Sequence, residues 1–179
     1  VRVGYIGGGT PSSLTTSQLE SLLNHIEKHF GTMEEFTVEA GRPDTLDEQK
    51  LRMIHHHPVT RISINPQTMN DETLVRIGRA HTAQQTIQAY RLARHIGFDD
   101  INMDVIAALP GENYAMFAHT LEEIRKLQPE SLTVHTLAIK RSSRLHEEKY
   151  AQREQDVARM VALGRRTAHE MGMHAYYLY

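Results

Sequence analysis

Short apolar runs alternate along this chain with stretches in which apolar residues recur at helical spacing. Such alternation of strands and helices implies parallel strand pairing through right-handed crossovers. The pattern therefore predicts a single domain of the α/β class, either an open sheet or part of a (β/α) barrel. The runs that predict strands are Val1 to Ile6, Phe36 to Ala40, Arg61 to Ile64, Ile101 to Ile106, Leu132 to Leu137 and Ala175 to Tyr179.

Capping signals predict where the helices between these strands begin and end. Ser, Thr and Gln or Glu at the right spacing can satisfy the free amides of a helix start, and Gly or Pro stops a helix. Five helical regions result. The signals are Thr15 to Ser17 with Gly31 for the first helix, Thr45 with Glu48 for the second, Thr82 with Gln85 for the third, Pro129 at the end of the fourth, and the polar segment Leu145 to Met171 for the fifth.

Composition narrows the function classes. The 179 residues carry a formal net charge of -2, which gives no electrostatic reason to expect nucleic acid or an anionic membrane as a partner. No apolar run approaches the roughly 20 residues that span a bilayer, so we expect a cytoplasmic protein. The chain has no cysteine, which excludes disulfides and thiolate metal ligands within it.

Polar residues interrupt or directly follow four of the predicted strands. They are Glu39, Asn65 with Gln67, Asp104 and His135. Strands of parallel sheets are normally apolar throughout, and α/β folds build their ligand sites at the carboxyl ends of the strands. The coincidence favours a functional site at that edge.

A structural explanation competes with this interpretation. Each polar group could be satisfied by a neighbouring strand or by backbone amides, and Glu39 or Asp104 could form a buried ion pair with Arg61.

A glycine-rich loop follows the first predicted strand. Gly7, Gly8 and Gly9 remove every side chain from the backbone path, so that a ligand could touch main-chain groups, and Thr10 adds a hydroxyl. The loop lacks the spacing of a dinucleotide fingerprint or of a P-loop, so a phosphate site is not supported. A tight turn with no ligand is the alternative.

The run His55-His56-His57 raises the question of a metal or heme site. Adjacent histidines point in different directions on a helix and cannot jointly bind one ion as an i, i+4 pair does. We expect an exposed helix end and predict no protein-only metal site.

Four motifs in order resemble the radical S-adenosylmethionine barrel of the oxygen-independent coproporphyrinogen III oxidases. The residues of the second and third motifs are more similar to the HemZ-like branch of this family than to HemN. The motifs are Tyr5-Ile6-Gly7-Gly8-Gly9-Thr10-Pro11, Val38-Glu39-Ala40-Gly41-Arg42-Pro43-Asp44-Thr45, Arg61-Ile62-Ser63-Ile64-Asn65-Pro66-Gln67, and Asn102-Met103-Asp104-Val105-Ile106 with Leu109-Pro110-Gly111-Glu112.

The resemblance implies a partial (β/α) barrel of the TIM-like kind that binds S-adenosylmethionine beside a 4Fe-4S cluster. In the family the cluster is held by a C-x-x-x-C-x-x-C loop after the first barrel strand. By position, Asp104 and Glu39 would accept from ribose hydroxyls or the ammonium group, and Arg79 would hold a carboxylate. The full set of implied cofactor contacts is Gly7, Gly8, Gly9, Thr10, Glu39, Gln67, Arg79, Asp104 and the backbone of Ala138.

The resemblance also implies a reaction and its partners. An electron donor would reduce the cluster, and cleavage of S-adenosylmethionine would give a 5′-deoxyadenosyl radical. That radical would start the oxidative decarboxylation of propionate side chains of a tetrapyrrole, converting coproporphyrinogen III to protoporphyrinogen IX in heme biosynthesis.

The missing cysteines depart from the family pattern. We expect residues 1–179 to be a truncated barrel that lacks the first strand and the cluster loop, and to be inactive alone. Three alternatives remain: a binding protein similar to the HemW-like heme chaperones, a radical enzyme with another substrate, and an inert fragment.

Overall fold

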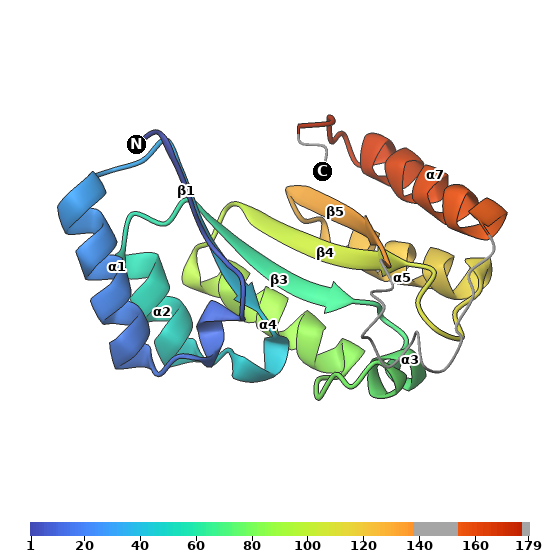
Figure 1. Cartoon of the computed structure of the whole chain (residues 1–179), viewed down its shortest axis with the longest axis horizontal. Helices are drawn as coiled ribbons and strands as arrows, with labels where there is room; N and C mark the ends of the chain where they lie inside the picture. Colours follow the sequence, from blue (N-terminus) through green and yellow to red (C-terminus); the bar gives the residue numbers. More distant parts are fainter. Residues whose placement is uncertain (138–153, 177–179) are drawn as a thin grey trace.

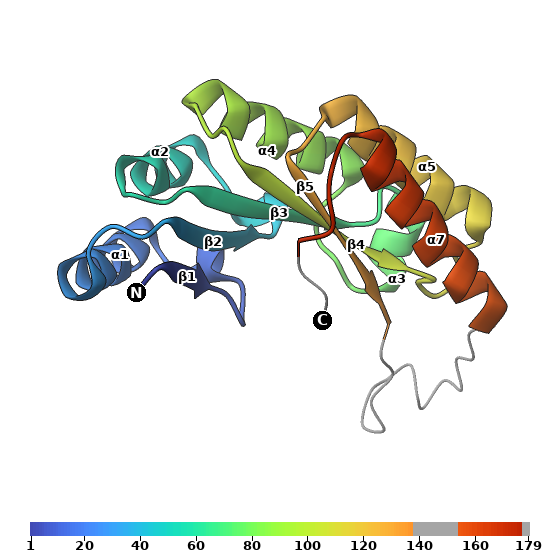
Figure 2. The ribbon, with the colours of Figure 1, turned by 90° about the horizontal axis from the view of Figure 1, so that it is seen from above.

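The fold is a curved sheet of parallel strands with helices along one side (Figures 1 and 2). The computed structural model describes residues 1–137 and 154–176. The strands are β1 (Val3–Ile6), β2 (Glu35–Gly41), β3 (Arg61–Gln67), β4 (Ile101–Ala107) and β5 (Ser131–Thr136). The helices are α1 (Thr16–Phe30), α2 (Glu48–His56), α3 (Asp71–Arg76), α4 (Ala83–Ile96), α5 (Tyr114–Leu127) and α7 (Glu154–Glu170), with short 3-10 turns η1 (Pro11–Ser13) and η2 (Pro43–Thr45).

The strands lie side by side in chain order, β1-β2-β3-β4-β5, and every pairing is parallel. Each crossover helix lies on the same side, because right-handed crossovers between successive neighbours always return on one face. Figure 2 shows α1, α2, α4 and α5 along the outside of the curved sheet. The α/β prediction is confirmed, and its barrel option is the correct one: the strands form a half-barrel.

The two faces of the sheet differ in chemistry. On the outer face, Val38, Ile64 and Met103 are fully buried beneath the helices. On the concave face, the alternate residues of the same strands are mostly polar, with Ile106 of β4 as an apolar exception. This alternation places a hydrophobic core on one side and a polar surface on the other. The other fully buried residues of the core include Leu19, Leu23, Leu51, Ile54, Ile62, Ile101 and Phe117.

Capping boxes begin α1 and α4; the sequence predicts the box at Thr82 and, for α1, a cap among Thr15 to Ser17. The hydroxyl of Thr15 accepts from the amide of Gln18 at 3.3 Å, and the Gln18 side chain accepts from the amide of Thr15 at 3.0 Å. Thr82 and Gln85 form the same pair of bonds at the start of α4, at 3.2 and 2.8 Å. Both helices thus begin where the sequence predicts.

The capping box predicted for Thr45 and Glu48 is wrong. The cap of α2 is Asp47, whose carboxylate accepts from the amide of Lys50 at 2.7 Å. The Thr45 hydroxyl is unavailable because it is turned inward, where it donates to the carbonyl of Arg42 at 2.8 Å.

The structure departs from the sequence pattern in two further elements. Ala175 and Tyr176 do not form the predicted sixth strand, and residues 177–179 lie outside the described part. Helix α3 was not predicted, because six residues are too few to show a helical period. Helix α7 confirms the fifth helical region from residue 154 onward, and residues 145–153 lie outside the described part.

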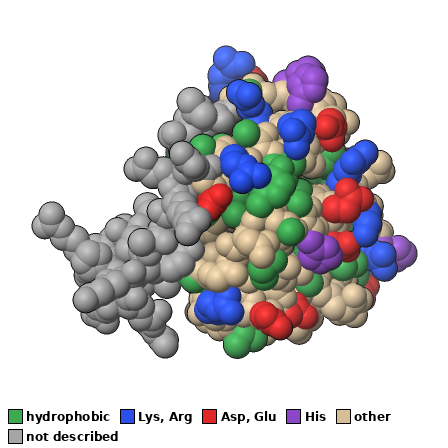
Figure 3. Space-filling model, turned by 90° about the vertical axis from the view of Figure 1, so that its right-hand side faces the viewer, with side chains coloured by type: hydrophobic (Ala, Val, Ile, Leu, Met, Phe, Trp, Pro, Cys, Tyr) green, Lys and Arg blue, Asp and Glu red, His purple; other side chains and the backbone are tan. Residues whose placement is uncertain are grey.

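None of the helices in the described ranges is long and apolar enough to cross a bilayer. On the face shown in Figure 3, basic and acidic side chains are interspersed around small hydrophobic areas rather than gathered by sign.

Candidate functional site

The predicted ligand residues within the described part of the chain lie around the concave face, toward the carboxyl ends of the strands. Glu39 lies near the end of β2 and Asp104 is the fourth residue of β4. The glycine loop follows β1 directly. The topology therefore brings together groups that are up to 97 residues apart in sequence, between Gly7 and Asp104.

The glycine loop contacts the side chain of Glu39. The amide of Gly8 donates to Oε2 of Glu39 at 3.3 Å. A Cβ added at Gly7 would overlap the ring of Tyr5 and lie 2.7 Å from the same Oε2. A Cβ at Gly9 would meet nothing within 4 Å. Gly7 is thus required by close packing, whereas Gly9 leaves open space beside the backbone.

Each carboxylate oxygen of Asp104 has a neighbouring polar group. Its Oδ1 accepts from Nδ2 of Asn102 at 2.6 Å, and its Oδ2 lies 3.8 Å from Nε2 of His135. The Asp104 carboxylate raises the pKa of His135 above its usual value. The pair adds a titratable group to this edge of the site.

Arg79 lies half-buried near this edge, where the carboxylates of Asp44 and Glu39 act on its charge from a distance. Burial lowers the pKa of its guanidinium, and the nearby Arg42 adds to the effect. Arg42 itself pairs with Asp44, at 2.6 Å between Nη2 and Oδ2. Within the described residues Arg79 has no ion pair, so this arrangement favours an anionic group from a ligand.

Gln67 and Thr10 have left-handed backbone conformations, with φ of 65° and 63°. Such conformations are uncommon outside glycine and often occur at functional sites. The carbonyl of Pro66, next to Gln67, contacts Nε2 of the buried His81 at 3.2 Å. His81 therefore contacts the backbone of the strained turn at the end of β3.

The proposed ion pair of Arg61 with Glu39 or Asp104 is wrong. Arg61 begins β3 and contacts Oε1 of Glu35 at 3.1 Å and Oδ2 of Asp100 at 2.9 Å. These partners lie at the amino ends of the strands. The carboxylates at the opposite edge are thus not neutralised by Arg61.

The three adjacent histidines have separate surroundings. His55 Nε2 contacts the carbonyl of Gly97 at 3.3 Å, and His57 Nδ1 contacts Glu27 at 3.2 Å. His56 is exposed. Across the described ranges no group of three or more His, Asp or Glu side chains is arranged to hold a metal ion.

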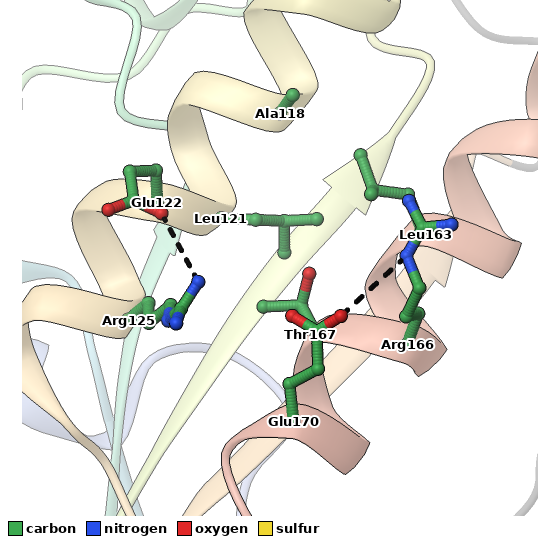
Figure 4. A pocket seen from close by; sticks show the side chains of 8 residues that line it. All are labelled: Ala118, Leu121, Glu122, Arg125, Leu163, Arg166, Thr167 and Glu170. Carbon is green, nitrogen blue, oxygen red and sulfur yellow. Dashed lines mark ion pairs between the residues drawn. The ribbon is translucent and has the colours of Figure 1, made fainter.

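A groove of about 250 Å³ lies between α5 and α7, away from the predicted ligand residues (Figure 4). Its charged lining residues contact one another, Arg125 with Glu122 at 3.9 Å and Arg166 with Glu170 at 4.0 Å. None of the predicted ligand residues lines it.

Sequence reasoning missed part of this face. Ser63 and Asn102 donate hydrogen bonds to Asn65 and Asp104, which it did identify, and Thr133 donates to Asn102. Their signal was a polar residue two positions before Asn65, Asp104 and His135, on the same face of each strand. Ala138 lies outside the described residues.

The donor set fits S-adenosylmethionine but not its cluster. Glu39 and Asp104 can accept from an ammonium or from hydroxyls, Arg79 can hold a carboxylate, and the glycine loop leaves room for a ligand to meet the backbone. A 4Fe-4S cluster requires thiolates, and the chain contains no cysteine.

A parallel half-barrel with polar groups and a glycine loop at the carboxyl ends of its strands defines a (β/α)-barrel protein with a ligand site at that edge. The family model described as the radical SAM superfamily matches residues 1–124. The chain belongs to this superfamily, as its motifs predict.

Named relatives agree with this assignment. The oxygen-independent coproporphyrinogen-III oxidase-like protein HemZ of Bacillus subtilis is 46% identical over 98% of this chain and 36% of that protein. The heme chaperone HemW of the same organism is 36% identical over 75% of this chain and 36% of that protein. The chain thus spans about a third of the length of these relatives.

Solved structures support the fold. Coproporphyrinogen III oxidase (HemN) from Escherichia coli superposes with a TM-score of 0.83 at 24% identity, over 96% of this chain and 41% of that one. Elp3 of Methanocaldococcus infernus gives a TM-score of 0.75 at 16% identity, over 90% of this chain and 44% of that one. Both structures share the half-barrel fold, and the family match assigns that half-barrel to the radical SAM superfamily.

Proposed function

We propose that this chain is the S-adenosylmethionine-binding part of an oxygen-independent coproporphyrinogen III oxidase-like enzyme. The whole enzyme would convert coproporphyrinogen III to protoporphyrinogen IX in the cytoplasm by oxidative decarboxylation of propionates to vinyl groups. The observation that carries the proposal is the half-buried Arg79, which has no ion pair within the described residues and lies near the carboxylate of Glu39, at the edge where Asp104 adds a second carboxylate. An amino-acid ligand carries the opposite charges of this set.

Each residue has a role in this proposal. Arg79 would hold the ligand carboxylate, Glu39 its ammonium group, and Asp104 the ribose hydroxyls. The loop from Gly7 to Thr10 would meet the methionine end with backbone groups. Gln67 and the backbone of Ala138 would complete the contacts. When bound beside a reduced cluster, S-adenosylmethionine supplies the 5′-deoxyadenosyl radical.

The cluster and the substrate site are proposed for the rest of the enzyme. The cysteines of a C-x-x-x-C-x-x-C loop would come from another part of the enzyme, since these 179 residues contain none. The 179 residues alone would therefore bind the ligand but not react with it. The protein's share is to orient the ligand and to exclude water.

Titration of the chain with S-adenosylmethionine tests the site. Arg79→Ala is expected to weaken binding by roughly ten- to a hundredfold, because a charge-assisted hydrogen bond contributes about 1.5–3 kcal/mol. Arg91→Ala, at an exposed position of α4, removes the same charge away from the strand ends and is the matched control. Equal affinity of the Arg79→Ala and Arg91→Ala variants would contradict the site.

A second experiment separates oxidase from chaperone. The protein that contains this chain, supplied with cluster, reductant and S-adenosylmethionine, is expected to consume coproporphyrinogen III with release of carbon dioxide. Heme binding and transfer without decarboxylation would instead identify a HemW-like chaperone. Turnover of S-adenosylmethionine without a change in coproporphyrinogen would identify another substrate.

A further inference from the structure

A chain of hydrogen bonds joins the two carboxylates of the site across three strands. Ser63 Oγ donates to Oδ1 of Asn65 at 2.6 Å, and Asn65 Nδ2 donates to Oε1 of Glu39 at 3.2 Å. Nδ2 of Asn102 donates both to Oγ of Ser63 at 2.8 Å and to Oδ1 of Asp104 at 2.6 Å. We call Asn65, Ser63 and Asn102 the carboxylate relay.

The direction of each bond in the relay is fixed by its neighbours. The carboxylate of Asp104 can only accept, so the amide nitrogen of Asn102 faces it, and Oδ1 of Asn102 accepts from Thr133 Oγ1 at 3.0 Å. A flipped Asn102 would place its carbonyl oxygen against the Asp104 carboxylate. The same holds at Asn65, whose carbonyl oxygen receives the Ser63 hydroxyl. Both ends of the relay therefore present N–H donors to carboxylates.

Two members of the relay, Ser63 and Asn65, are buried, and Asn102 is partly buried. Ser63 is 1% exposed and Asn65 is 5% exposed. Burying such groups costs free energy that their hydrogen bonds at best offset, and apolar residues at these positions would form the same strands. On the outer face of β3, for example, the buried residues Ile62 and Ile64 are apolar and form part of the same strand. Fold stability alone thus gives no reason for the relay.

We propose that Asn65, Ser63 and Asn102 are positioning residues, which hold the carboxylates of Glu39 and Asp104 at a fixed separation and as hydrogen-bond acceptors toward the ligand. The inference rests on the proposed S-adenosylmethionine site. Ser63 is the central member, because its hydroxyl is the link between the two asparagines.

The relay has an energetic consequence that a set of independent contacts lacks. Removal of Glu39 leaves Asn65 without its acceptor, which loosens Ser63 and Asn102 and hence the support of Asp104. The effects of removing the two carboxylates on ligand affinity are therefore coupled through Ser63. Electrostatic repulsion between the carboxylates does not depend on that hydroxyl.

The first test measures the affinity of the chain for S-adenosylmethionine in Ser63→Ala. Loss of one hydrogen-bonded hydroxyl is expected to weaken binding about fivefold. Thr37→Val is the matched control, because Thr37 is also buried, is on the concave face of β2, and stands outside the relay. Thermal unfolding of both variants establishes that each is folded.

The second test is a double-mutant cycle of Glu39→Ala and Asp104→Ala, measured with and without Ser63→Ala. With Ser63 present, the double variant is expected to lose less affinity than the product of the two single losses. In the Ser63→Ala background this coupling is expected to diminish toward the product of the single losses. Coupling of equal size in both backgrounds would overturn the relay.

The outcomes separate the relay from the proposed function. If the carboxylate variants lose affinity while Ser63→Ala behaves like Thr37→Val, the ligand site stands and the relay is refuted. If the unsubstituted chain does not bind S-adenosylmethionine, the proposed function fails and the role of the relay fails with it.

Discussion

His81 shows at the scale of one residue how the fold holds the end of β3. Its side chain is fully buried, with Nε2 at 3.2 Å from the carbonyl of Pro66. Nδ1 has no hydrogen-bond partner among the residues that the structure describes, and it lies 3.8 Å from Oδ1 of Asp44. Burial lowers the pKa of His81 below its usual value. A neutral imidazole that donates from Nε2 accounts for this contact with Pro66.

This lowered pKa predicts a loss of stability in acid. Below the ordinary histidine pKa of 6.5, His81 takes up a proton in the unfolded chain before it does in the folded one. Unfolding is then favoured as pH falls, by at most about 1.4 kcal/mol per pH unit for one proton. The contribution of His81 is complete above this range. Denaturant unfolding between about pH 7 and pH 5 measures the slope.

His81→Gln keeps a donor for Pro66 and removes the titration, so its free energy of unfolding should fall less steeply with decreasing pH. His25→Gln, on the exposed face of α1, is the control and should keep the slope of the unsubstituted chain. His135, whose pKa is raised, changes the pH dependence of stability in the opposite direction to His81. Because His135 is present in all three proteins, its contribution cancels in the comparison. Parallel slopes for the His81→Gln variant and the unsubstituted chain would show that His81 does not titrate as proposed.

At the scale of elements, a buried lysine joins the two 3-10 turns that follow β1 and β2. Nζ of Lys50 donates to the carbonyl of Ser12 in η1 at 2.6 Å and to that of Thr45 in η2 at 3.2 Å. The hydroxyls of Ser12 and Thr45 are 2.6 Å apart, and Ser12 donates to the carbonyl of Ala40. Helix α2 thus fixes the glycine loop relative to β2.

Lys50→Met is expected to destabilise the chain by about 1–3 kcal/mol. Two buried carbonyls lose a charged donor, and relief from burying the ammonium offsets part of the loss. Lys28→Met, at an exposed position of α1, is the control and should stay within about 0.5 kcal/mol. Chemical denaturation measures both variants. A Lys50→Met variant as stable as the control would mean that the turns hold together without the lysine.

The same turns explain which elements could be predicted from sequence. Capping boxes at Thr15 and Thr82 depend on bonds that span three residues, so their sequence signal is complete. Thr45 carries the same signal, but its hydroxyl is turned inward, toward the carbonyl of Arg42 and toward Ser12, which is 33 residues away. Local pattern could not reveal that competition.

The residues of the candidate site also differ in whether a local sequence pattern reveals them. Glu39 and Asp104 are visible as polar interruptions of apolar strands. The role of Ser63 depends on its register opposite Asn102 in the neighbouring strand, which no local pattern specifies.

At the scale of the whole molecule, the two edges of the half-barrel carry different charged groups. The carboxyl ends of the strands hold the ligand residues, and the amino ends hold the Arg61 cluster, which consists of Arg61, Glu35, Asp100 and Tyr176. Tyr176 OH donates to Glu35 Oε1 at 2.6 Å, and its ring lies 5.3 Å from Cζ of Arg61. The segment after α7 is thereby attached to the start of β2 and β3.

Arg61 is the centre of this cluster. Although burial disfavours its charge, hydrogen bonds to Asp100 and Tyr176 raise the pKa of the guanidinium. Its side chain is 18% exposed, and the partner carboxylates are 25% and 32% exposed. Removing the arginine would leave two partly buried carboxylates without a counter-charge. The seven residues of β3 place Arg61 about 20 Å from the turn that carries Gln67.

Arg61→Met is therefore expected to lower the free energy of unfolding by about 1–3 kcal/mol while leaving the affinity of the folded chain for S-adenosylmethionine within about twofold. Arg125→Met is the control for loss of an arginine, because Arg125 is 55% exposed and its contact with Glu122 is 3.9 Å long. Its stability should change by less than about 0.5 kcal/mol. Denaturant unfolding and ligand titration of the same preparations give both quantities. A large loss of affinity in folded Arg61→Met would show that the amino ends of the strands control the ligand site, contrary to the division of roles inferred from the fold.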